Sequence, residues 1–372
     1  MLISKRDSTI LRELAARQAE LAAGDAVRKL YGEWQQFGRD DPGARPMIRI
    51  ELGTFAEDII PPLMRCEGEQ ARSIEWMLHS NVVNHMLFQD DTLVRDHLSV
   101  PMSCFFEPFG LKVQREYAQI QHGAGTGHRF VPYLHELKRD FHLLGPSRYG
   151  IDRERTAQRL EQLNELLGDL LPVKYENDAM VISPMQNIVH IMSMEDMFVA
   201  MCDEPELFQE MMRRLTDDYE AWFDLMERER VLTPTASDQH LCQGSYCFTG
   251  TLPDSGEEIK LKDIWLYMDS QETSGVSPEM YKTFVLPYYK HLAGKFGLIS
   301  YGCCEAVHDL WRDGLDKIAN MGKVSISPWC DEPMMGEALR GSGIVYLRKP
   351  TPNLLGVGEG LDEEAVREHI RS

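Results

Sequence analysis

The chain of 372 residues carries a formal net charge of −20 at pH 7 and is 43% hydrophobic. This charge argues against a nucleic-acid surface or an anionic membrane as the main partner, and no apolar run is long enough to predict a membrane span. Eight cysteines at irregular spacing do not predict a disulfide framework, and the opening MLISKRDSTILREL has no apolar core of signal-peptide length. We therefore expect a cytoplasmic protein.

The first half of the sequence predicts helices, two strands and long loops. Apolar residues recur at helical spacing over 8–36 and 67–87, whereas 45–52 and 98–106 are typical of strands. We interpret 1–45 as an N-terminal helical extension. The glycine-rich segment 122–128 lacks the Lys-Ser/Thr ending of a phosphate loop and could form a lid over a pocket.

From residue 151 onward, predicted helices and strands alternate. The helices cover 152–170, 194–202, 205–231, 277–296, 305–319 and 332–340. The strands cover 171–176, 236–242, 263–269, 298–303, 323–327 and 344–349. In the helix over 277–296, Ser277 is suited to the N-cap and Pro278 to the first helical position. Such alternation predicts a parallel sheet with crossover helices.

Strand candidates are centred near residues 48, 100, 173, 238, 266, 300, 325 and 346, which is the number a (β/α)8 TIM barrel needs. We therefore expect an α/β fold in which 1–372 form a single TIM-barrel domain with the helical extension at its start. An open doubly wound sheet is the alternative. No glycine fingerprint follows the first strand to favour it.

Polar and sulfur-bearing side chains follow several predicted strands, and barrel enzymes place their active sites at such strand ends. These residues are Asp269, Ser270, Gln271 and Glu272, then Cys303, Cys304 and Glu305, then Trp329, Cys330 and Asp331, then Arg348 and Lys349. Zinc binds thiolates, imidazoles and carboxylates. Glu272, Cys330 and one of Cys303 and Cys304 could supply a zinc site, because adjacent strand residues point to opposite faces.

Other interpretations compete with this zinc site. Free cysteine is often a small buried hydrophobe, so packing is the simpler interpretation of any single cysteine here. His240, Cys242 and Cys247 form a second possible metal site, because His-x-Cys places both side chains on one face of a strand. The sequence contains no Gly-x-Ser-x-Gly, protein-kinase or HExxH motif, which disfavours a serine hydrolase or a metalloprotease.

Three C-terminal segments resemble the uroporphyrinogen decarboxylase-like superfamily. They are SPEMYKTFVLPYYK, YGCCEAVHDLWRDGLDKIANMGKVSISPWCDE and VYLRKPTPNLL. The resemblance covers roughly 160–355. Within the superfamily, the chain is more similar to the corrinoid-dependent methyltransferases of the aryl methyl ether demethylase type. The Arg-Gln-Ala-Gly-Arg motif of true decarboxylases is absent, and RKPTPN replaces their Gly-Asn-Leu-Asp-Pro turn. Tyr301-Gly302-Cys303 stands where related thiol methyltransferases have a zinc-binding His-x-Cys.

The resemblance implies a zinc-dependent methyltransferase that moves a methyl group from a small O-methylated, aromatic substrate to the cobalt of cobalamin on a partner corrinoid protein. Zn2+ would act as Lewis acid. In this chain Glu272 and Cys330 would substitute for the missing histidine and the distant third cysteine, and would bind zinc together with Cys303 or Cys304. Tyr267, Tyr301 or His308 could donate a hydrogen bond to the reacting group. Trp265, Trp329, Met194 and Arg348 would bind substrate.

Two other functions stay open at this stage. One is a decarboxylase or lyase that acts on a carboxylated substrate, with Arg348 and Lys349 as anion clamps. The other is a non-catalytic binding module. Homodimerisation is one option for the oligomeric state, and the methionine-rich stretch 192–201 fits a helix face that packs in the core or lines an apolar pocket.

Overall fold

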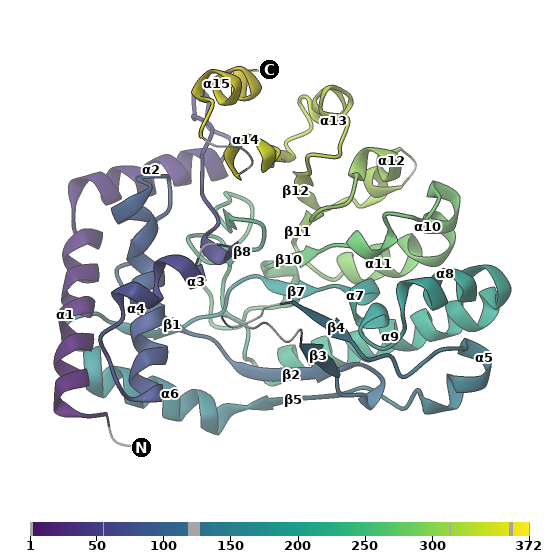
Figure 1. The fold of residues 1–372 in the computed structure, drawn as a ribbon, viewed down its shortest axis with the longest axis horizontal. Coiled ribbons are helices and arrows are strands. Elements are labelled where there is room, and N and C mark those ends of the chain that lie inside the picture. The colour runs from purple at the N-terminus through teal and green to yellow at the C-terminus, as the bar shows by residue number, and fades with distance from the viewer. Residues whose placement is uncertain (1–2, 55, 118–126, 313, 357–359, 372) are drawn as a thin grey trace. The chain divides into compact units, whose positions relative to one another are not determined.

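The computed structural model describes residues 3–54, 56–117, 127–312, 314–356 and 360–371, and its fold is mixed α/β (Figure 1). The chain forms two compact units. Unit 1 comprises Met1–Cys104, Ile151–Met180 and Arg230–Ile264, and unit 2 comprises Phe105–Gly150, Val181–Glu229 and Trp265–Ser372. The barrel and its single-domain boundary stay predictions, since neither is tested by this division. Most of the predicted lid segment lies outside the described residues.

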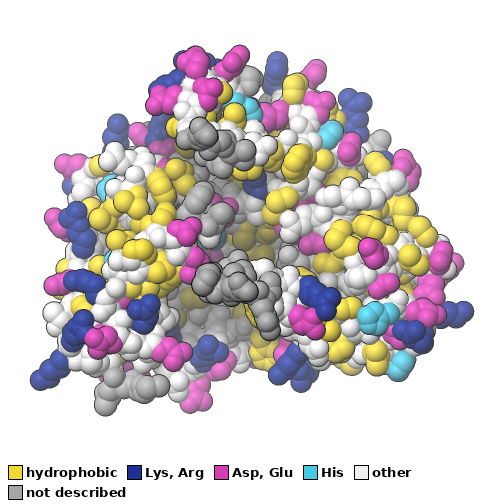
Figure 2. Space-filling view, viewed as in Figure 1, with side chains coloured by type: hydrophobic (Ala, Val, Ile, Leu, Met, Phe, Trp, Pro, Cys, Tyr) yellow, Lys and Arg dark blue, Asp and Glu magenta, His cyan; other side chains and the backbone are white. Residues whose placement is uncertain are grey.

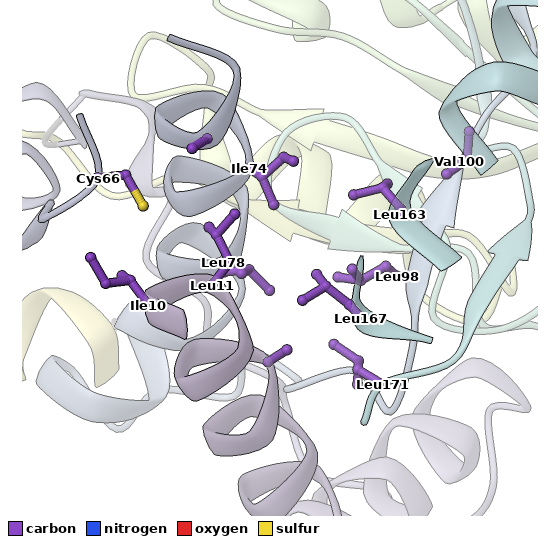
Figure 3. Close-up of a cluster of buried hydrophobic side chains, with 12 residues drawn as sticks. Ile10, Leu11, Cys66, Ile74, Leu78, Leu98, Val100, Leu163, Leu167 and Leu171 are labelled. Atoms are coloured by element: carbon purple, nitrogen blue, oxygen red, sulfur yellow. The ribbon is translucent and has the colours of Figure 1, made fainter. Parts of the chain in front are cut away.

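Unit 1 is built on packed helices and a parallel strand pair. Its helices are α1 (Lys5–Ala22), α2 (Asp25–Gly38), α3 (Ala56–Ile59), α4 (Glu69–Leu87) and α6 (Arg153–Leu167). β1 (Leu98–Val100) pairs in parallel with β6 (Val173–Tyr175), and β8 (His240–Leu241) forms a hairpin with β9 (Ser245–Tyr246). Leu11, Leu78, Leu98 and Leu167 are at most 1% exposed within one apolar cluster (Figure 3). Helical spacing thus buries one face of α1, α4 and α6 together.

Two predictions for residues 8–52 need correction. The helix predicted over 8–36 is two helices, because Gly24 takes an extended conformation between them and glycine favours the helix least among residues other than proline. The strand predicted over 45–52 is absent from the described residues there. The N–H groups of Ile48 and Ile50 instead donate to carboxylates of Asp91 at 2.7 Å and Asp90 at 2.6 Å. Side chains therefore satisfy the backbone donors that a neighbouring strand would otherwise take.

Unit 2 contains a five-stranded parallel sheet with the order β13-β12-β11-β10-β7 (Figure 1). The strands are β7 (Met180–Ile182), β10 (Trp265–Met268), β11 (Leu298–Tyr301), β12 (Met321–Ile326) and β13 (Val345–Arg348). Every residue of β10 is buried, as is typical of a parallel strand covered on both faces. The strands predicted over 263–269, 298–303, 323–327 and 344–349 are confirmed, whereas β7 was not predicted.

Helices accompany this sheet. They are α5 (Leu137–Asp140), α7 (Pro184–Val189), α8 (Met194–Asp203), α9 (Pro205–Arg228), α10 (Pro278–Phe284), α11 (Leu286–Ala293), α12 (Val307–Trp311), α13 (Glu332–Leu339), α14 (Asn353–Gly356) and α15 (Glu363–Arg371). The Ser277 cap is confirmed, since its Oγ accepts the N–H of Met280 at 3.2 Å. The helix predicted over 277–296 divides at Val285, because Pro287 cannot continue the hydrogen-bond ladder of α10. The helix predicted over 305–319 is only the five residues of α12 and a short turn.

Four further strands complete the described elements of the sheets. β2 (Ser103–Glu107) pairs with β5 (Arg148–Asp152), and β3 (Arg115–Tyr117) pairs antiparallel with β4 (His128–Phe130). The strand predicted over 236–242 is reduced to the two residues of β8.

The charged side chains on one face of the surface are mixed rather than separated by sign (Figure 2). On the face shown in Figure 2, Lys and Arg side chains are scattered among Asp and Glu rather than gathered into a basic field. None of the helices in the described part of the chain is both long and apolar enough to cross a membrane.

Candidate active site

Three buried carboxyl groups lie at the carboxyl ends of β10 and β11, and we call Asp269, Glu272 and Glu305 the carboxyl cluster. Asp269 directly follows β10, and Glu272 lies in the short turn behind it. Because β10 and β11 are parallel neighbours, their ends meet, and Ser270 donates its N–H to Glu305 at 3.0 Å. The exposed fractions of the three residues are 5%, 7% and 1%, so water screens them little.

One carboxylate oxygen of Asp269 accepts a hydrogen bond, and the other has no partner among the described residues. Its Oδ2 accepts from the Tyr267 hydroxyl at 3.0 Å. Within the described residues, its buried Oδ1 accepts no hydrogen bond. Burial raises the pKa of Asp269, although hydrogen bonds from Ser183 and Tyr267 and the charge of Lys349 oppose the rise. Lys349 itself donates its Nζ to the Cys303 carbonyl at 2.8 Å.

Glu272 has the pKa best placed for proton transfer. Burial, with the nearby charges of Asp269 and Glu305, raises the pKa of Glu272 to about 7. Its buried Oε2 has no hydrogen-bond partner among the residues that the structure describes. Near neutral pH this carboxyl group therefore exists in both protonation states, as a general acid or base requires.

Glu305 ties the two loops together. Its Oε1 accepts the Ser270 N–H at 3.0 Å, and its Oε2 accepts the Cys303 N–H at 2.8 Å. Burial still raises its pKa, because two N–H groups offset only part of the cost of a buried charge. No ion pair within the described ranges includes a carboxylate of the carboxyl cluster. Within the described residues the cluster is thus negative or protonated, and the charge of Lys349 acts on Asp269 from nearby.

Buried tyrosines pack next to the cluster. The Tyr301 hydroxyl lies 2.6 Å from Ser270 Oγ and 2.8 Å from the Tyr281 hydroxyl. Tyr289 donates its hydroxyl to the Asp269 carbonyl at 2.7 Å. Burial raises the pKa of Tyr267, Tyr281, Tyr289 and Tyr301, so all four remain neutral phenols at neutral pH. Of the predicted hydrogen-bond donors, Tyr267 contacts the carboxyl cluster directly, and Tyr301 reaches it through Ser270.

The predicted zinc ligands are near these loops but do not form a metal site in the described residues. Cys303 Sγ lies 3.5 Å from Cys304 Sγ, and Cys330 Sγ lies 3.6 Å from Ser327 Oγ. Burial raises the pKa of Cys303 to about 12, which favours the thiol over the thiolate that zinc binds. Among the described residues, no group of three or more His, Cys, Asp or Glu side chains could hold a metal ion. These positions do not fit zinc as placed.

The remaining predicted site residues have other surroundings. His308 on α12 places Nε2 3.4 Å from Asp309, and Met194 at the start of α8 is 43% exposed. Arg348 pairs with Glu332 at 2.6 Å, so its charge is already compensated. Trp265 begins β10, at the strand end away from Asp269, and Lys323 Nζ lies 5.2 Å from its ring. Trp329 is 73% exposed.

The second possible metal site lies on the β8–β9 hairpin of unit 1. There the His240 N–H donates to Asp178 Oδ1 at 2.7 Å, and Cys247 Sγ lies 3.8 Å from the His240 carbonyl. The absence of a metal-binding group applies to His240, Cys242 and Cys247 as well, all of which are described.

Unit 1 contains an ionic network that sequence reasoning missed, formed by Arg95, His97, Glu176 and Asp238. Arg95 forms a salt bridge with Glu176 and donates its Nε to Asp238 at 2.9 Å. His97 Nε2 lies 3.1 Å from Glu176 Oε2. Burial alone would raise the pKa of Glu176, but the His97 hydrogen bond and the Arg95 charge hold it well below its usual range. Such a compensated network is typical of structural polar cores.

Sequence reasoning considered Asp269 and Glu305 as strand-end residues but did not select them as site residues. The strand-end rule itself could have found them, because both stand beside predicted ligands in sequence. No family model matches the chain, and neither a curated protein nor a solved structure matches it. The geometry of the carboxyl cluster is therefore the structural basis for the proposals that follow.

Proposed function

We propose that the protein is a cytoplasmic (β/α)8-barrel methyltransferase. In this proposal it takes a methyl group from a small O-methylated substrate and passes it to the cobalt of a separate corrinoid protein. The resemblance of 160–355 to corrinoid-dependent methyltransferases supports the reaction class. The observation that carries the catalytic part is the carboxyl cluster, which is buried at the ends of parallel strands. That position is where barrel enzymes hold their catalytic groups.

Glu272 is the proton donor in this proposal. When an aryl ether loses its methyl group, the CH3–O bond breaks and its electron pair stays on the oxygen. A phenolate is a poor leaving group, so a proton delivered to that oxygen lowers the barrier. Glu272 holds a proton in a large share of molecules at neutral pH, and its Oε2 makes no competing hydrogen bond within the described residues. A positioned acid contributes about 10²–10⁴-fold to rate.

Asp269 and Glu305 are positioning residues for Glu272. Their charges help to raise its pKa, so the proton is retained to neutral pH. Tyr267 fixes the Asp269 carboxylate and also lies 3.2 Å from the Gly302 carbonyl, which links the ends of β10 and β11. Loss of either carboxylate would lower the pKa of Glu272 and weaken it as an acid near pH 7.

Zinc is kept as a prediction of the resemblance, and no chemical step is assigned to it, because the described ligands do not converge. Metal content of the purified protein, with Glu272→Gln, Cys303→Ser and Cys330→Ser variants, tests this point. About one zinc per chain that is lost in these variants would show that the site closes around metal. If all three variants retain zinc, the metal site lies elsewhere, and His240 and Cys242 are the next residues to test.

The corrinoid protein needs a surface to contact, and Trp329 offers one. It lies just after β12, at the same edge of the sheet as Asp269, and 73% of its surface is exposed. Tryptophan is enriched at the energetic centres of protein interfaces. We therefore assign Trp329 to partner contact rather than to the wall of a buried substrate pocket.

Methyl transfer from a methoxyphenol to reduced cobalamin tests the proposal, followed by loss of cob(I)alamin absorbance. Glu272→Gln should lower the rate about 10²–10⁴-fold. Glu279→Gln is the matched control, because Glu279 is exposed in the first turn of α10, and it should retain the full rate. Full activity in Glu272→Gln would remove its assigned role. A wild-type protein that turns over a carboxylated compound without any corrinoid would instead establish the decarboxylase alternative.

A further inference from the structure

Two free thiols of neighbouring residues lie close together just after β11. Cys303 Sγ and Cys304 Sγ are 3.5 Å apart, and no disulfide joins them. Cys304 is exposed and Cys303 is half-buried, so a small oxidant reaches Cys304 first. Gly302 precedes the pair at φ 101°, where a Cβ would lie 3.3 Å from Ser325 and Val307. The turn therefore depends on glycine to hold both thiols on one side of the chain.

We propose that Cys303 and Cys304 are a reversible oxidation site, which closes to a disulfide between adjacent residues on reaction with hydrogen peroxide. The Cys304 sulfur first attacks the peroxide, the O–O bond breaks, and Cys304 sulfenic acid forms with release of one water. The Cys303 thiol then attacks the sulfenic sulfur, the S–S bond forms, and a second water leaves. Two thiols are oxidised and one peroxide is reduced.

Geometry makes this bond accessible and also easy to reverse. The two sulfurs need to move from 3.5 Å to about 2.0 Å apart, which a rotation of side chains largely supplies. Adjacent Cα atoms are about 3.8 Å apart, closer than disulfides usually bridge. The resulting ring is strained, and strained disulfides are the more readily reduced, regulatory ones.

The backbone N–H and carbonyl of Cys303 connect this thiol pair to the carboxyl cluster and its neighbours. Its N–H donates to Glu305 Oε2 at 2.8 Å, and its carbonyl accepts Lys349 Nζ at 2.8 Å and Ser325 Oγ at 3.3 Å. Closing the ring changes the backbone between Cys303 and Cys304, and with it these hydrogen bonds. Oxidation would thereby loosen the support of Glu305. This chemistry does not depend on the proposed methyl transfer.

Mass spectrometry of the full-length protein tests the proposal. Reduced protein is treated with hydrogen peroxide, alkylated with N-ethylmaleimide, digested and analysed. The peptide that contains Cys303 and Cys304 should be two hydrogens lighter and unalkylated, and dithiothreitol should restore both thiols. Cys304 found as a lasting sulfenic or sulfinic acid, or paired with Cys330, would overturn the proposal.

Variants and hydrogen exchange separate the two parts of the inference. Cys303→Ser should leave Cys304 as a sulfenic acid that dimedone labels, and Cys304→Ser should slow oxidation of Cys303 at least tenfold. Cys202→Ser, at an exposed thiol on α8, is the matched control and should change neither result. Amides of 300–305 should exchange faster after oxidation of the wild type. Unchanged exchange would remove the link to Glu305.

Discussion

The ionic network of unit 1 and the carboxyl cluster of unit 2 both place carboxyl groups beside parallel strands. Among the described residues, the ionic network pairs its carboxylates with the cation of Arg95, whereas no such ion pair is seen in the carboxyl cluster. Arg95 and His97 hold the pKa of Glu176 below its usual range. In the carboxyl cluster, burial and like charge raise the pKa of Glu272 to about 7. The same residue type is therefore structural where its charge is paired and suited to proton transfer where it is not.

The largest effect should follow from removing the cation of the ionic network. Arg95→Met leaves the half-buried Glu176 and the buried Asp238 without the guanidinium that pairs with both carboxylates. We expect the free energy of unfolding to fall by about 3–5 kcal/mol, measured by urea denaturation at pH 7. Arg213→Met is the control, because the ion pairs of Arg213 are exposed and should matter little. If both variants lose the same free energy of unfolding, the ion pairs of Arg95 are no more stabilising than exposed ones, and the proposed difference between the two clusters is wrong.

Substitution of Glu272 should raise the free energy of unfolding, whereas substitution of Arg95 lowers it. Its folded-state pKa of about 7 lies above its ordinary value of 4.5, so the folded protein binds its proton more tightly. Glu272 therefore costs stability increasingly as pH rises from 4.5 to 7, and the full cost persists above pH 7. The free energy of unfolding of Glu272→Gln, relative to that of the wild type, should therefore rise by on the order of 1–3 kcal/mol when the pH is raised from 5 to 8.

Urea titrations of both proteins at the two pH values measure this difference. Glu279→Gln, at an exposed position, serves as the control and should show no such dependence. A Glu272→Gln variant that loses stability equally at both pH values would mean that Glu272 is paired after all.

The smallest effect concerns the support of Asp269. Tyr267→Phe removes the hydroxyl that donates to Asp269 Oδ2, and this should cost about 1 kcal/mol of unfolding free energy. It should also raise the pKa of Asp269 further, since that hydrogen bond lowers it. Tyr117→Phe, at a hydroxyl on a side chain that is 62% exposed, should be neutral. Thermal unfolding of both variants provides the comparison.

Sequence patterns predicted the structure correctly where the local sequence alone determines the element. The strands β10 to β13 are confirmed, because a short continuous apolar run between predicted helices is typical of a strand in a parallel sheet. The strand predicted over 45–52 was wrong, because alternation does not reveal whether Asp90 and Asp91 will take the backbone N–H groups. Glu176 and Asp238 lie 81 and 143 positions from Arg95, so no local pattern could join them.

The candidate site shows the same limit. The strand-end rule placed Glu272, Cys303 and Cys330 near the carboxyl ends of three neighbouring strands. It could not show that Glu305 is bound by the N–H groups of Ser270 and Cys303, because these bonds depend on the register of β10 against β11. Ligand types at plausible positions are thus predictable, whereas their convergence requires coordinates.

The protonation state of Glu272 tests the central claim most directly. An infrared titration of the wild type, with Glu272→Gln subtracted, reports the carboxyl stretching band of this group alone. We predict a midpoint near pH 7. A midpoint near its ordinary value of 4.5 would contradict the account, because Glu272 would then carry no proton to give at neutral pH.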